Sequence, residues 1–213
     1  MSKYIANLIS QGEHQTLDFK HSITDSKKIA RSLCAFANTN GGILLIGVKD
    51  NGNIAGVNSE EEYYMVETAA QLFCKPEIPF KVTKWEVNGK TVLEIVVKPG
   101  KHKHKAPDKN GDYKPYIRVK DENIIASPLR QKIWKAQTNR RSLKIILSDK
   151  ENQLFEYLKA NKKITVNQYS RIGFVSSVDA EKTLIDLTVL GLLYYTQTQD
   201  GDFFESVRDS NPH

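Results

Sequence analysis

The segment from Ile29 to Val57 constrains the fold most strongly. It places a helix-forming stretch, a Gly-Gly turn and an almost wholly apolar strand in direct succession. The apolar residues Ile29, Leu33 and Phe36 recur at helical spacing, and Gly41 and Gly42 then permit the left-handed turn that ends a helix. The apolar run Ile43–Val48 predicts a strand that is buried on both faces. The loop at the end of such a strand lies on a rigid base, where functional sites are often built.

Three carboxylates surround this segment. Glu13 and Asp18 bracket the start of a strand predicted over residues 15–20, and Asp50 follows the apolar strand. If the two strands are neighbours, the three side chains could converge at a sheet edge, where oxygen ligands of this kind suit magnesium or manganese. The alternative is three solvated surface acids, with Asp50 serving only its own turn.

The rest of the chain predicts two domains joined by a basic helix. Asn88-Gly89 indicates a hairpin between residues 80–87 and 91–97, and a capping box from Ser59 opens another helix. After Ser148 the pattern predicts three helices, the second over Thr165–Ile172 and the third capped by Ser177, followed by a hairpin, which is the element order of a winged helix-turn-helix. The expected divisions are a mixed-sheet domain flanked by helices (residues 1–128), a basic helix or linker (129–147), a winged-helix-like domain (148–207) and a tail (208–213).

Charge is distributed unevenly between these parts. Residues 1–147 hold 24 Lys and Arg against 15 Asp and Glu, whereas residues 148–213 hold 7 against 10. A basic first part is attracted to polyanions such as nucleic acid. Two tracts supply the cations expected to contact a phosphate backbone: Lys101, Lys103, Lys105, Lys114, Arg118 and Lys120 in the first, and Arg130, Lys132, Lys135, Arg140 and Arg141 in the second. The aromatic residues Tyr113, Tyr116 and Trp134 lie among them and could stack on unpaired bases.

Several sequence blocks together resemble a known family. The blocks are EHQTLDFK from Glu13, LCAFANTNGG from Leu33, LLIGVKD from Leu44, KTVLEIVV from Lys90 and YIRV from Tyr116. Over about residues 8–128 the chain resembles the Schlafen-type AlbA domain, which is widely described as DNA-binding. The resemblance implies an α+β fold with a mixed sheet flanked by helices, and a role in binding nucleic acid, as in regulator-like bacterial proteins.

The resemblance also suggests an enzymatic alternative. In nuclease-active Schlafens two Glu residues and a later Asp hold the metal ion of a ribonuclease site, and the matching positions here are Glu13, Asp18 and Asp50, with Lys20 as a contact for the scissile phosphate. Asp18 is one methylene shorter than the glutamate of the active members, which displaces a ligand. Some family members are described as ATP-binding, but this sequence has no G-x-x-x-x-G-K-[ST] loop. Active Schlafens carry two related lobes, so a single copy here suggests a homodimer.

Three functional hypotheses follow. The first is a nucleic-acid-binding protein that acts as a transcription regulator. The second is a metal-dependent endoribonuclease acting on structured RNA. The third is a non-catalytic module whose basic surface meets an acidic protein. The third helix of the C-terminal part carries Asp179, Glu181 and Asp186 against Lys182, so it suits protein contact at least as well as a phosphate-walled groove.

The expected location is cytoplasmic. No apolar run approaches the roughly 18 residues that cross a bilayer, and the N-terminus has no signal-peptide pattern. Cys34 and Cys74 fall in apolar helical patterns and are expected to be buried and reduced.

Overall fold

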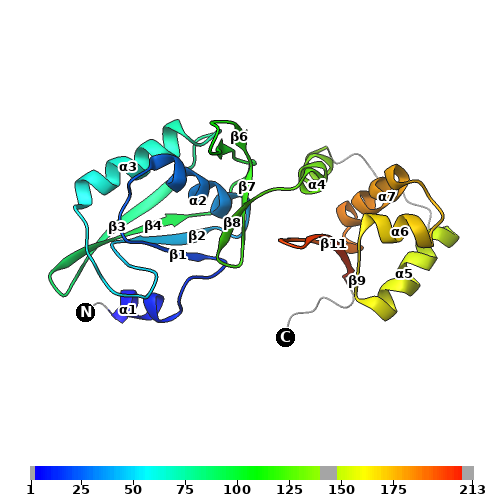
Figure 1. Cartoon of the computed structure of the whole chain (residues 1–213), viewed down its shortest axis with the longest axis horizontal. Coiled ribbons are helices and arrows are strands. Elements are labelled where there is room, and N and C mark those ends of the chain that lie inside the picture. Colours follow the sequence, from blue (N-terminus) through cyan, green and yellow to red (C-terminus); the bar gives the residue numbers. More distant parts are fainter. Residues whose placement is uncertain (1–2, 140–147, 208–213) are drawn as a thin grey trace. The chain divides into compact units, whose positions relative to one another are not determined.

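A computed structural model describes residues 3–139 and 148–207 of the chain. It divides into two compact units, Met1–Ala126 and Ser127–His213, and each is considered by itself (Figure 1). The predicted positions Arg140 and Arg141 lie outside the described residues.

The first unit is built on a four-stranded mixed sheet in the order β1-β2-β4-β3. Its strands are Leu17–Lys20 (β1), Gly42–Ile46 (β2), Phe80–Val87 (β3) and Lys90–Val97 (β4). Strands β1 and β2 run parallel, with Asp18 level with Leu44, whereas β4 runs antiparallel to both of its neighbours. The α+β class with a mixed sheet is therefore confirmed.

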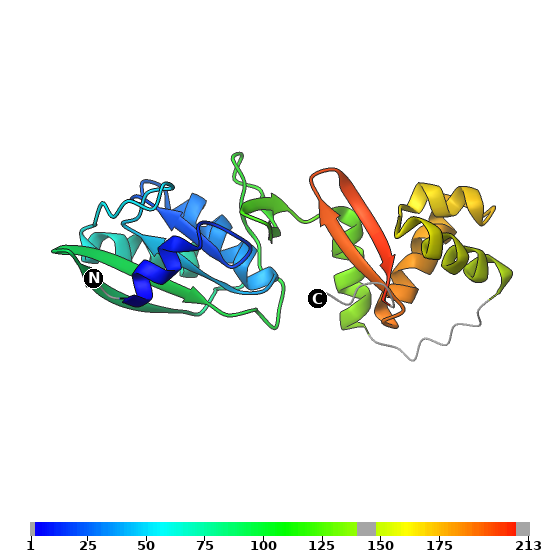
Figure 2. The ribbon, with the colours of Figure 1, turned by 90° about the horizontal axis from the view of Figure 1, so that it is seen from below.

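Helices cover both faces of this sheet (Figures 1 and 2). Helices α2 (Ser26–Asn38) and α3 (Ser59–Leu72) pack on one face, where Leu44 and Ile46 join their apolar cluster. Helix α1 (Lys3–Ser10) lies on the other face, where Leu45 joins a second cluster. The central strand β2 thus sends alternate side chains into two apolar layers, as its unbroken hydrophobic run predicts.

Two small ribbons lie beyond the main sheet in the first unit. Strands β5 (Ala106–Pro107) and β6 (Tyr113–Lys114) form one antiparallel pair. Strands β7 (Tyr116–Val119) and β8 (Glu122–Ile125) form the other. Helix α2 contacts both ribbons, chiefly through β7, so this one helix links the main sheet to the basic tract.

Local signals set several element ends. Asp25 caps α2 by accepting the backbone N–H of Lys27 at 2.8 Å. The helix ends where Gly41, at φ +74°, donates its N–H to the carbonyl of Phe36 at 2.9 Å. Asn88 and Gly89 both have positive φ, which confirms the predicted tight hairpin between β3 and β4.

Two local predictions were wrong. Helix α3 is capped by Asn58, whose side chain accepts the N–H of Glu60, so Ser59 is its first residue. Helix α7 is capped by Ser176, which accepts from Asp179, so Ser177 is inside the helix. Both errors chose between adjacent residues that cap equally well. Beyond the turn at Asp50, Ile54 forms a single bridge with Val48, and the positive-φ residue Gly56 interrupts the segment that follows.

The described part of the second unit, residues 127–139 and 148–207, contains four helices and a small sheet. Its elements, in chain order, are α4 (Pro128–Thr138), α5 (Asp149–Asn161), β9 (Lys163–Ile164), α6 (Val166–Ile172), α7 (Ser177–Val189), β10 (Leu193–Thr198) and β11 (Gly201–Ser206). The sheet order is β10-β11-β9. The predicted sequence of three helices and a hairpin is therefore present from residue 148 onward.

Helix α4 departs from its predicted role as part of a linker. Its residues Leu129 and Ile133 are buried in one apolar cluster with Leu154, Leu184 and Phe204 of the second unit. The prediction assigned its basic residues to contact with phosphates, but an amphipathic helix keeps cations on one face and packs the other. Helix α4 is therefore part of the second core.

The cysteines are free thiols and buried, as predicted. Burial raises the pKa of Cys34 to about 12 and also raises the pKa of Cys74. Both thiols therefore stay protonated, which makes them unreactive. Among the described helices, none combines the length and the apolar character needed to cross a bilayer.

Gly41 provides a test of the turn between α2 and β2. A Cβ at Gly41 would lie 2.7 Å from the carbonyl oxygen of Val97, in addition to the cost of its positive φ. We expect Gly41→Ala to lower the free energy of unfolding by about 2 kcal/mol or more, measured by urea denaturation. Gly89→Ala is the matched control, because Gly89 has φ +72° and open space around the added Cβ. Equal losses in the two variants would show that the contact at Val97 contributes nothing.

Candidate functional site

Asp18 is a buried acid at the centre of the first unit. It lies on β1 between Leu17 and Phe19, which point into the α1 layer, and its side chain points to the α2 face. The residue is only 2% exposed. A carboxylate at such a position is stable only when it is paired and hydrogen-bonded.

Two cations and a hydroxyl surround Asp18. Its Oδ1 accepts a hydrogen bond from Lys20 Nζ at 3.0 Å and lies 3.5 Å from Arg118 Nη2. Its Oδ2 accepts from the hydroxyl of Ser32 on α2 at 3.4 Å. The charge of Asp18 is therefore balanced by side chains of the same unit.

Arg118 is fixed by several further contacts. Its guanidinium donates to the carbonyl of Leu17 at 3.2 Å and to Oδ1 of Asn123 at 3.1 Å, and it lies over the ring of Phe36. Asn123 in turn donates to the Ser32 hydroxyl at 2.9 Å. With an exposure of 2%, Arg118 cannot contact a phosphate backbone, so its predicted role in nucleic-acid binding was wrong.

Glu13 joins this group as a second carboxyl. Its Oε1 accepts the backbone N–H of Phe19 at 2.8 Å and lies 3.9 Å from Lys20 Nζ. Burial, together with the hydrogen bond to Asp18 and the charge of Asp18, raises the pKa of Glu13 to about 7. Burial acts to raise the pKa of Asp18 too, but its hydrogen bond with Glu13 and the charges of Lys20 and Arg118 hold it below its usual value.

The carboxyl pair therefore holds one proton close to neutral pH. The proton resides on Glu13, which donates it toward the ionised Asp18. Two carboxyls whose environments separate their pKa values in this way can act as a proton donor and a fixed negative charge.

Asp50 does not join the pair. It lies in an exposed turn that begins after β2 has ended, six residues beyond Leu44, which is the partner of Asp18 in the sheet. Within residues 3–139 and 148–207, no group of three or more His, Cys, Asp or Glu side chains is placed so that it could hold a metal ion.

The residues present do not fit a magnesium or manganese ion. A divalent cation prefers a set of oxygen ligands, whereas the oxygens of Asp18 already face Lys20, Arg118 and Ser32. The predicted convergence of Glu13, Asp18 and Asp50 required the turn after β2 to fold back toward β1. Instead, Gly47 turns the chain toward Ala55 and Gly56, whose backbone N–H groups bond its carbonyl.

Ser32 and Asn123 are site residues that sequence reasoning missed. Ser32 follows Arg31 in a helix that was interpreted by its apolar positions alone, and Asn123 lies in a short strand that was not predicted. A usable signal was present in YIRV, where Arg118 falls between apolar residues of a strand, a pattern that can point a charge into the core.

The basic tract of the first unit, from Lys101 to Lys120, is held in place by the buried residue His104. His104 is 5% exposed; its N–H donates to Oδ1 of Asn38 at 2.8 Å, and its ring Nδ1 donates to the carbonyl of Pro76 at 2.8 Å. The amide of Asn38 donates to the carbonyls of His104 and Tyr116 at 2.9 and 2.8 Å. The end of α2 thus holds the tract at its centre.

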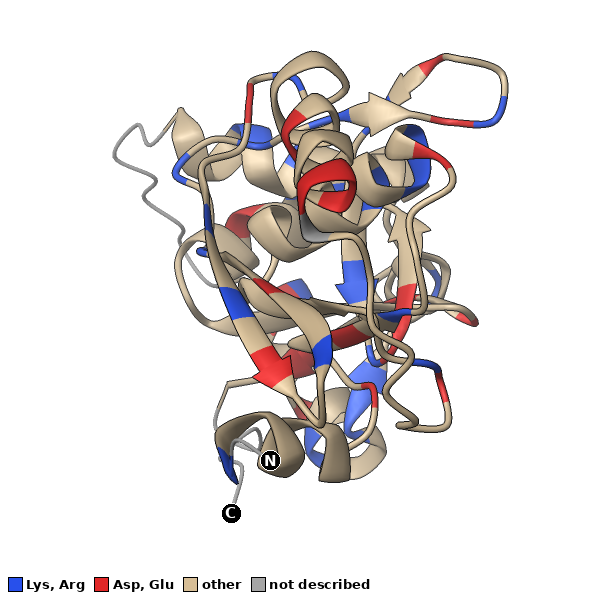
Figure 3. Ribbon diagram, turned by 90° about the vertical axis from the view of Figure 1, so that its left-hand side faces the viewer, with Lys and Arg blue, Asp and Glu red and all other residues tan. Residues whose placement is uncertain are grey.

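The lysines flanking His104 have different environments. Lys101, Lys105 and Lys120 are exposed. Lys103 is also exposed and its ammonium donates to the carbonyl of Asn38 at 3.4 Å, and Lys114 lies 3.6 Å from the carboxylate of Asp112. Figure 3 shows Lys and Arg interspersed with Asp and Glu along the ribbon.

The aromatic residues of this tract do not form the predicted stacking set. Tyr116 is 6% exposed, which leaves no open ring face for a base. Tyr113 is half-buried and already has the Lys75 ammonium over its ring at 4.1 Å.

The second tract is used largely inside the second unit. Arg130 stacks over the ring of Tyr195 at 4.7 Å and donates to Gln197 at 3.2 Å. Lys132 forms an ion pair with Glu181, whereas Lys135 is exposed. The Arg130 and Lys132 side chains therefore stabilise the packing of α4.

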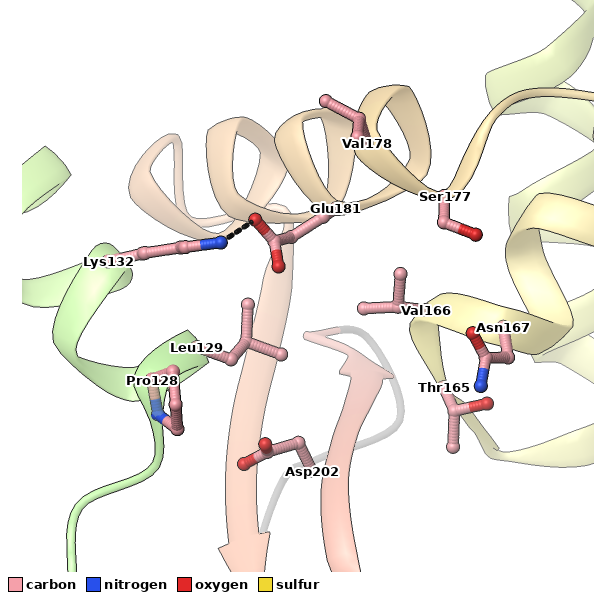
Figure 4. A pocket seen from close by; sticks show the side chains of 10 residues that line it. All are labelled: Pro128, Leu129, Lys132, Thr165, Val166, Asn167, Ser177, Val178, Glu181 and Asp202. Atoms are coloured by element: carbon pink, nitrogen blue, oxygen red, sulfur yellow. Dashed lines mark hydrogen bonds and ion pairs between the residues drawn. The ribbon is translucent and has the colours of Figure 1, made fainter.

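A groove of about 640 Å³ lies between α4, α6 and α7 of the second unit (Figure 4). The Lys132–Glu181 pair connects α4 to α7 beside it, and Leu129 and Val166 form part of its apolar lining. Val178 on α7 is 77% exposed at the same groove. The groove thus combines apolar surface with a partly neutralised acid.

Glu13 gives the first unit a defined pH dependence. Its pKa is about 7 in the folded protein against an ordinary value of 4.5, so between these values the folded state holds a proton that the unfolded state has released. We expect stability to fall as pH rises through this window, measured as the melting temperature from pH 4.5 to 8.

In Glu13→Gln the amide imitates the protonated acid, and this part of the pH dependence should disappear. Glu77→Gln, at an exposed position, is the control and should retain it. A Glu13→Gln profile that is parallel to that of the wild type would rule out the shifted proton.

Two solved structures share limited similarity with the chain. A protein of Corynebacterium diphtheriae, DIP2311, matches with 20% identity and a TM-score of 0.42 over 60% of this chain, which corresponds to 28% of that chain. The N-terminal domain of a RecG-related protein from Nitrosomonas europaea matches with 18% identity and a TM-score of 0.38, covering 68% of this chain and 95% of that domain. The family model described as Schlafen, AlbA_2 matches residues 13–127, more than half of the chain. The chain belongs to the Schlafen AlbA_2 family.

Proposed function

We propose that this protein binds nucleic acid through the basic surface of its first unit. The observation that carries the proposal is the anchored tract, in which exposed lysines flank the buried His104. Family membership supports a role connected with nucleic acid. Lys101, Lys105 and Lys120 supply the exposed ammonium groups, and Lys103 adds a further one.

The expected mode is contact with the phosphate backbone. Lysine ammonium groups are strongly hydrated point charges that bind phosphates without reading bases. Such binding releases counterions, so its affinity falls steeply as salt rises. The carboxyl pair has no direct part in it, because Lys20 and Arg118 already balance its charge.

The metal-dependent endoribonuclease is the weaker alternative. It requires Glu13, Asp18 and Asp50 to share an ion, and the donor set described above does not fit one. The interaction-module alternative differs in its partner, and the salt dependence of binding to nucleic acid distinguishes the two.

Removing two exposed lysines tests the proposed surface. We expect Lys101→Gln with Lys105→Gln to weaken binding to a labelled duplex and to reduce the slope of log K against log salt by about 2, because each phosphate contact contributes about 1. Fluorescence anisotropy over a range of salt concentrations measures both quantities. Lys81→Gln with Lys84→Gln on β3 is the control pair with the same change in net charge. Equal effects of the two pairs would place binding elsewhere on the unit.

We further propose that the second unit is a winged helix that pairs two copies of the chain. Its element order and three-stranded sheet are those of the motif. Helix α7 occupies the position of a recognition helix, but its acids Asp179, Glu181 and Asp186 outnumber Lys182, which disfavours a DNA groove. The apolar groove beside α7 favours contact with protein.

Solution mass tests this pairing. We expect the wild type to sediment at twice the chain mass of 24.2 kDa, and Val178→Lys to sediment as a monomer, because a charge would enter the apolar contact. Tyr194→Lys, at a residue 57% exposed on β10 outside the groove, should leave the mass unchanged. A wild-type monomer at micromolar concentration would contradict the pairing.

A further inference from the structure

The first unit contains a cavity that is distinct from the carboxyl pair. It has a volume of about 490 Å³, within the range of small-molecule sites. Helix α2 contributes Arg31, the loop between β5 and β6 contributes Lys109 and Asn110, and β7 and β8 contribute Tyr116 and Asn123. Helix α2 and the stretch from residue 108 to residue 125, which are distant in sequence, therefore meet around one small volume.

Two cations at this cavity have unused donors. Arg31 donates only its Nε, to the carbonyl of Pro107 at 2.8 Å, and this bond fixes the plane of the guanidinium group. Neither terminal nitrogen of Arg31, nor the ammonium of Lys109, has a hydrogen-bond or ion-pair partner among the residues that the structure describes. The cavity therefore offers a fixed planar donor and a mobile point charge.

The one acid in the cavity wall is engaged by its own loop. Oδ1 of Asp108 accepts the backbone N–H groups of Asn110 at 2.8 Å and Asp112 at 3.0 Å. These bonds shape the turn that carries Lys109. Because the Asp108 carboxylate is partly neutralised there, Arg31 and Lys109 leave the cavity with an excess of positive charge.

Neutral donors complete the wall. Tyr116 is 6% exposed, and no hydrogen bond joins its hydroxyl to another described residue. Since no buried side-chain oxygen or nitrogen in the described parts lacks a partner, this hydroxyl must reach solvent, and the cavity is where Tyr116 is open. Asn123 is held in place by its bonds with Arg118 and Ser32, which connect the cavity to the carboxyl pair.

We infer that this cavity binds a phosphate group carried by a nucleotide, either free or at the end of a nucleic-acid strand. A guanidinium with both terminal nitrogens available matches two phosphate oxygens, and a lysine adds a charge-assisted bond to the third. The Tyr116 hydroxyl supplies a neutral donor, and Ile125, which is 45% exposed at the cavity, supplies apolar surface for a sugar. The inference deepens the proposed binding of nucleic acid by giving it a specific phosphate contact.

Calorimetric titration of the full chain with AMP and with adenosine tests the inference. AMP should bind, whereas adenosine, which lacks the phosphate, should bind at least about tenfold more weakly. Lys109→Gln should weaken AMP binding by about tenfold, because a charge-assisted hydrogen bond is lost. Tyr116→Phe, which removes only the hydroxyl, should weaken AMP binding without lowering the melting temperature.

Lys81→Gln is the matched control, because it removes the same charge from β3, outside both the cavity and the lysine surface. Equal binding of AMP and adenosine, or equal losses in Lys109→Gln and Lys81→Gln, would overturn the inference.

A second arm identifies the source of the phosphate. A single-stranded oligonucleotide with a 5′-phosphate that binds more tightly than the same strand with a 5′-hydroxyl, with the difference lost in Lys109→Gln, assigns the group to a strand end. AMP binding without such a difference assigns it to a free nucleotide. If both strands bind equally and AMP does not bind, the inference about this cavity is contradicted. The proposed function, binding through the lysine surface, then still holds. If AMP binds but no nucleic-acid strand binds, the cavity inference stands and the proposed function is contradicted.

Discussion

The first unit depends on the buried ion pair between Asp18 and Arg118. It joins β1 of the main sheet to β7 of a separate ribbon, and both residues are almost fully removed from water. A buried pair of this kind gains little over an apolar one, but the loss of either partner leaves a charge stranded in the core at a cost of about 3–5 kcal/mol. The pair therefore specifies which ribbon docks on the sheet more than it adds to stability.

This ion pair also explains the state of the neighbouring carboxyl. Arg118 and Lys20 together compensate one negative charge fully, and a second charge on Glu13 would lie next to Asp18 in a half-buried site. Retaining a proton on Glu13 avoids that repulsion. Glu13 and Asp18 thus form a charge-balanced group with Lys20 and Arg118 of the same unit. Their proximity is explained by the stability of the fold and does not require a catalytic role.

Much of the fold could be predicted because its signals are local. The periodicity of α2, the apolar run of β2 and the Asn88-Gly89 turn each specify an element within a few residues. The role of Arg118 could not be found in this way. It was grouped with the surface lysines by proximity in sequence, whereas its burial depends on β1, which is a hundred residues earlier. The predicted grouping of Asp50 with Glu13 and Asp18 was wrong for a related reason, since the position of Asp50 depends on how the chain turns after a strand ends.

The second unit shows the same division between local and long-range information. The three helices after Ser148 and the hairpin that follows them were predicted from local patterns, and all are present. The assignment of α4 to the second core depends on contacts between Leu129 and residues far along the chain, which sequence spacing does not reveal. Charge again suggested nucleic-acid contact wrongly, because the Arg130 and Lys132 side chains attach α4 to the rest of the second unit.

The anchoring of His104 by Asn38 has a consequence for how tightly a polyanion is held. A lysine-rich loop that is disordered when free must lose backbone freedom on binding, at roughly 1–2 kcal/mol for each residue that becomes ordered. Here the hydrogen bonds to the end of α2 restrict that freedom during folding. The lysine side chains remain mobile, but they extend from a backbone that is already in place. Each ammonium–phosphate contact can then contribute more of its intrinsic attraction to affinity, as in a preorganised receptor.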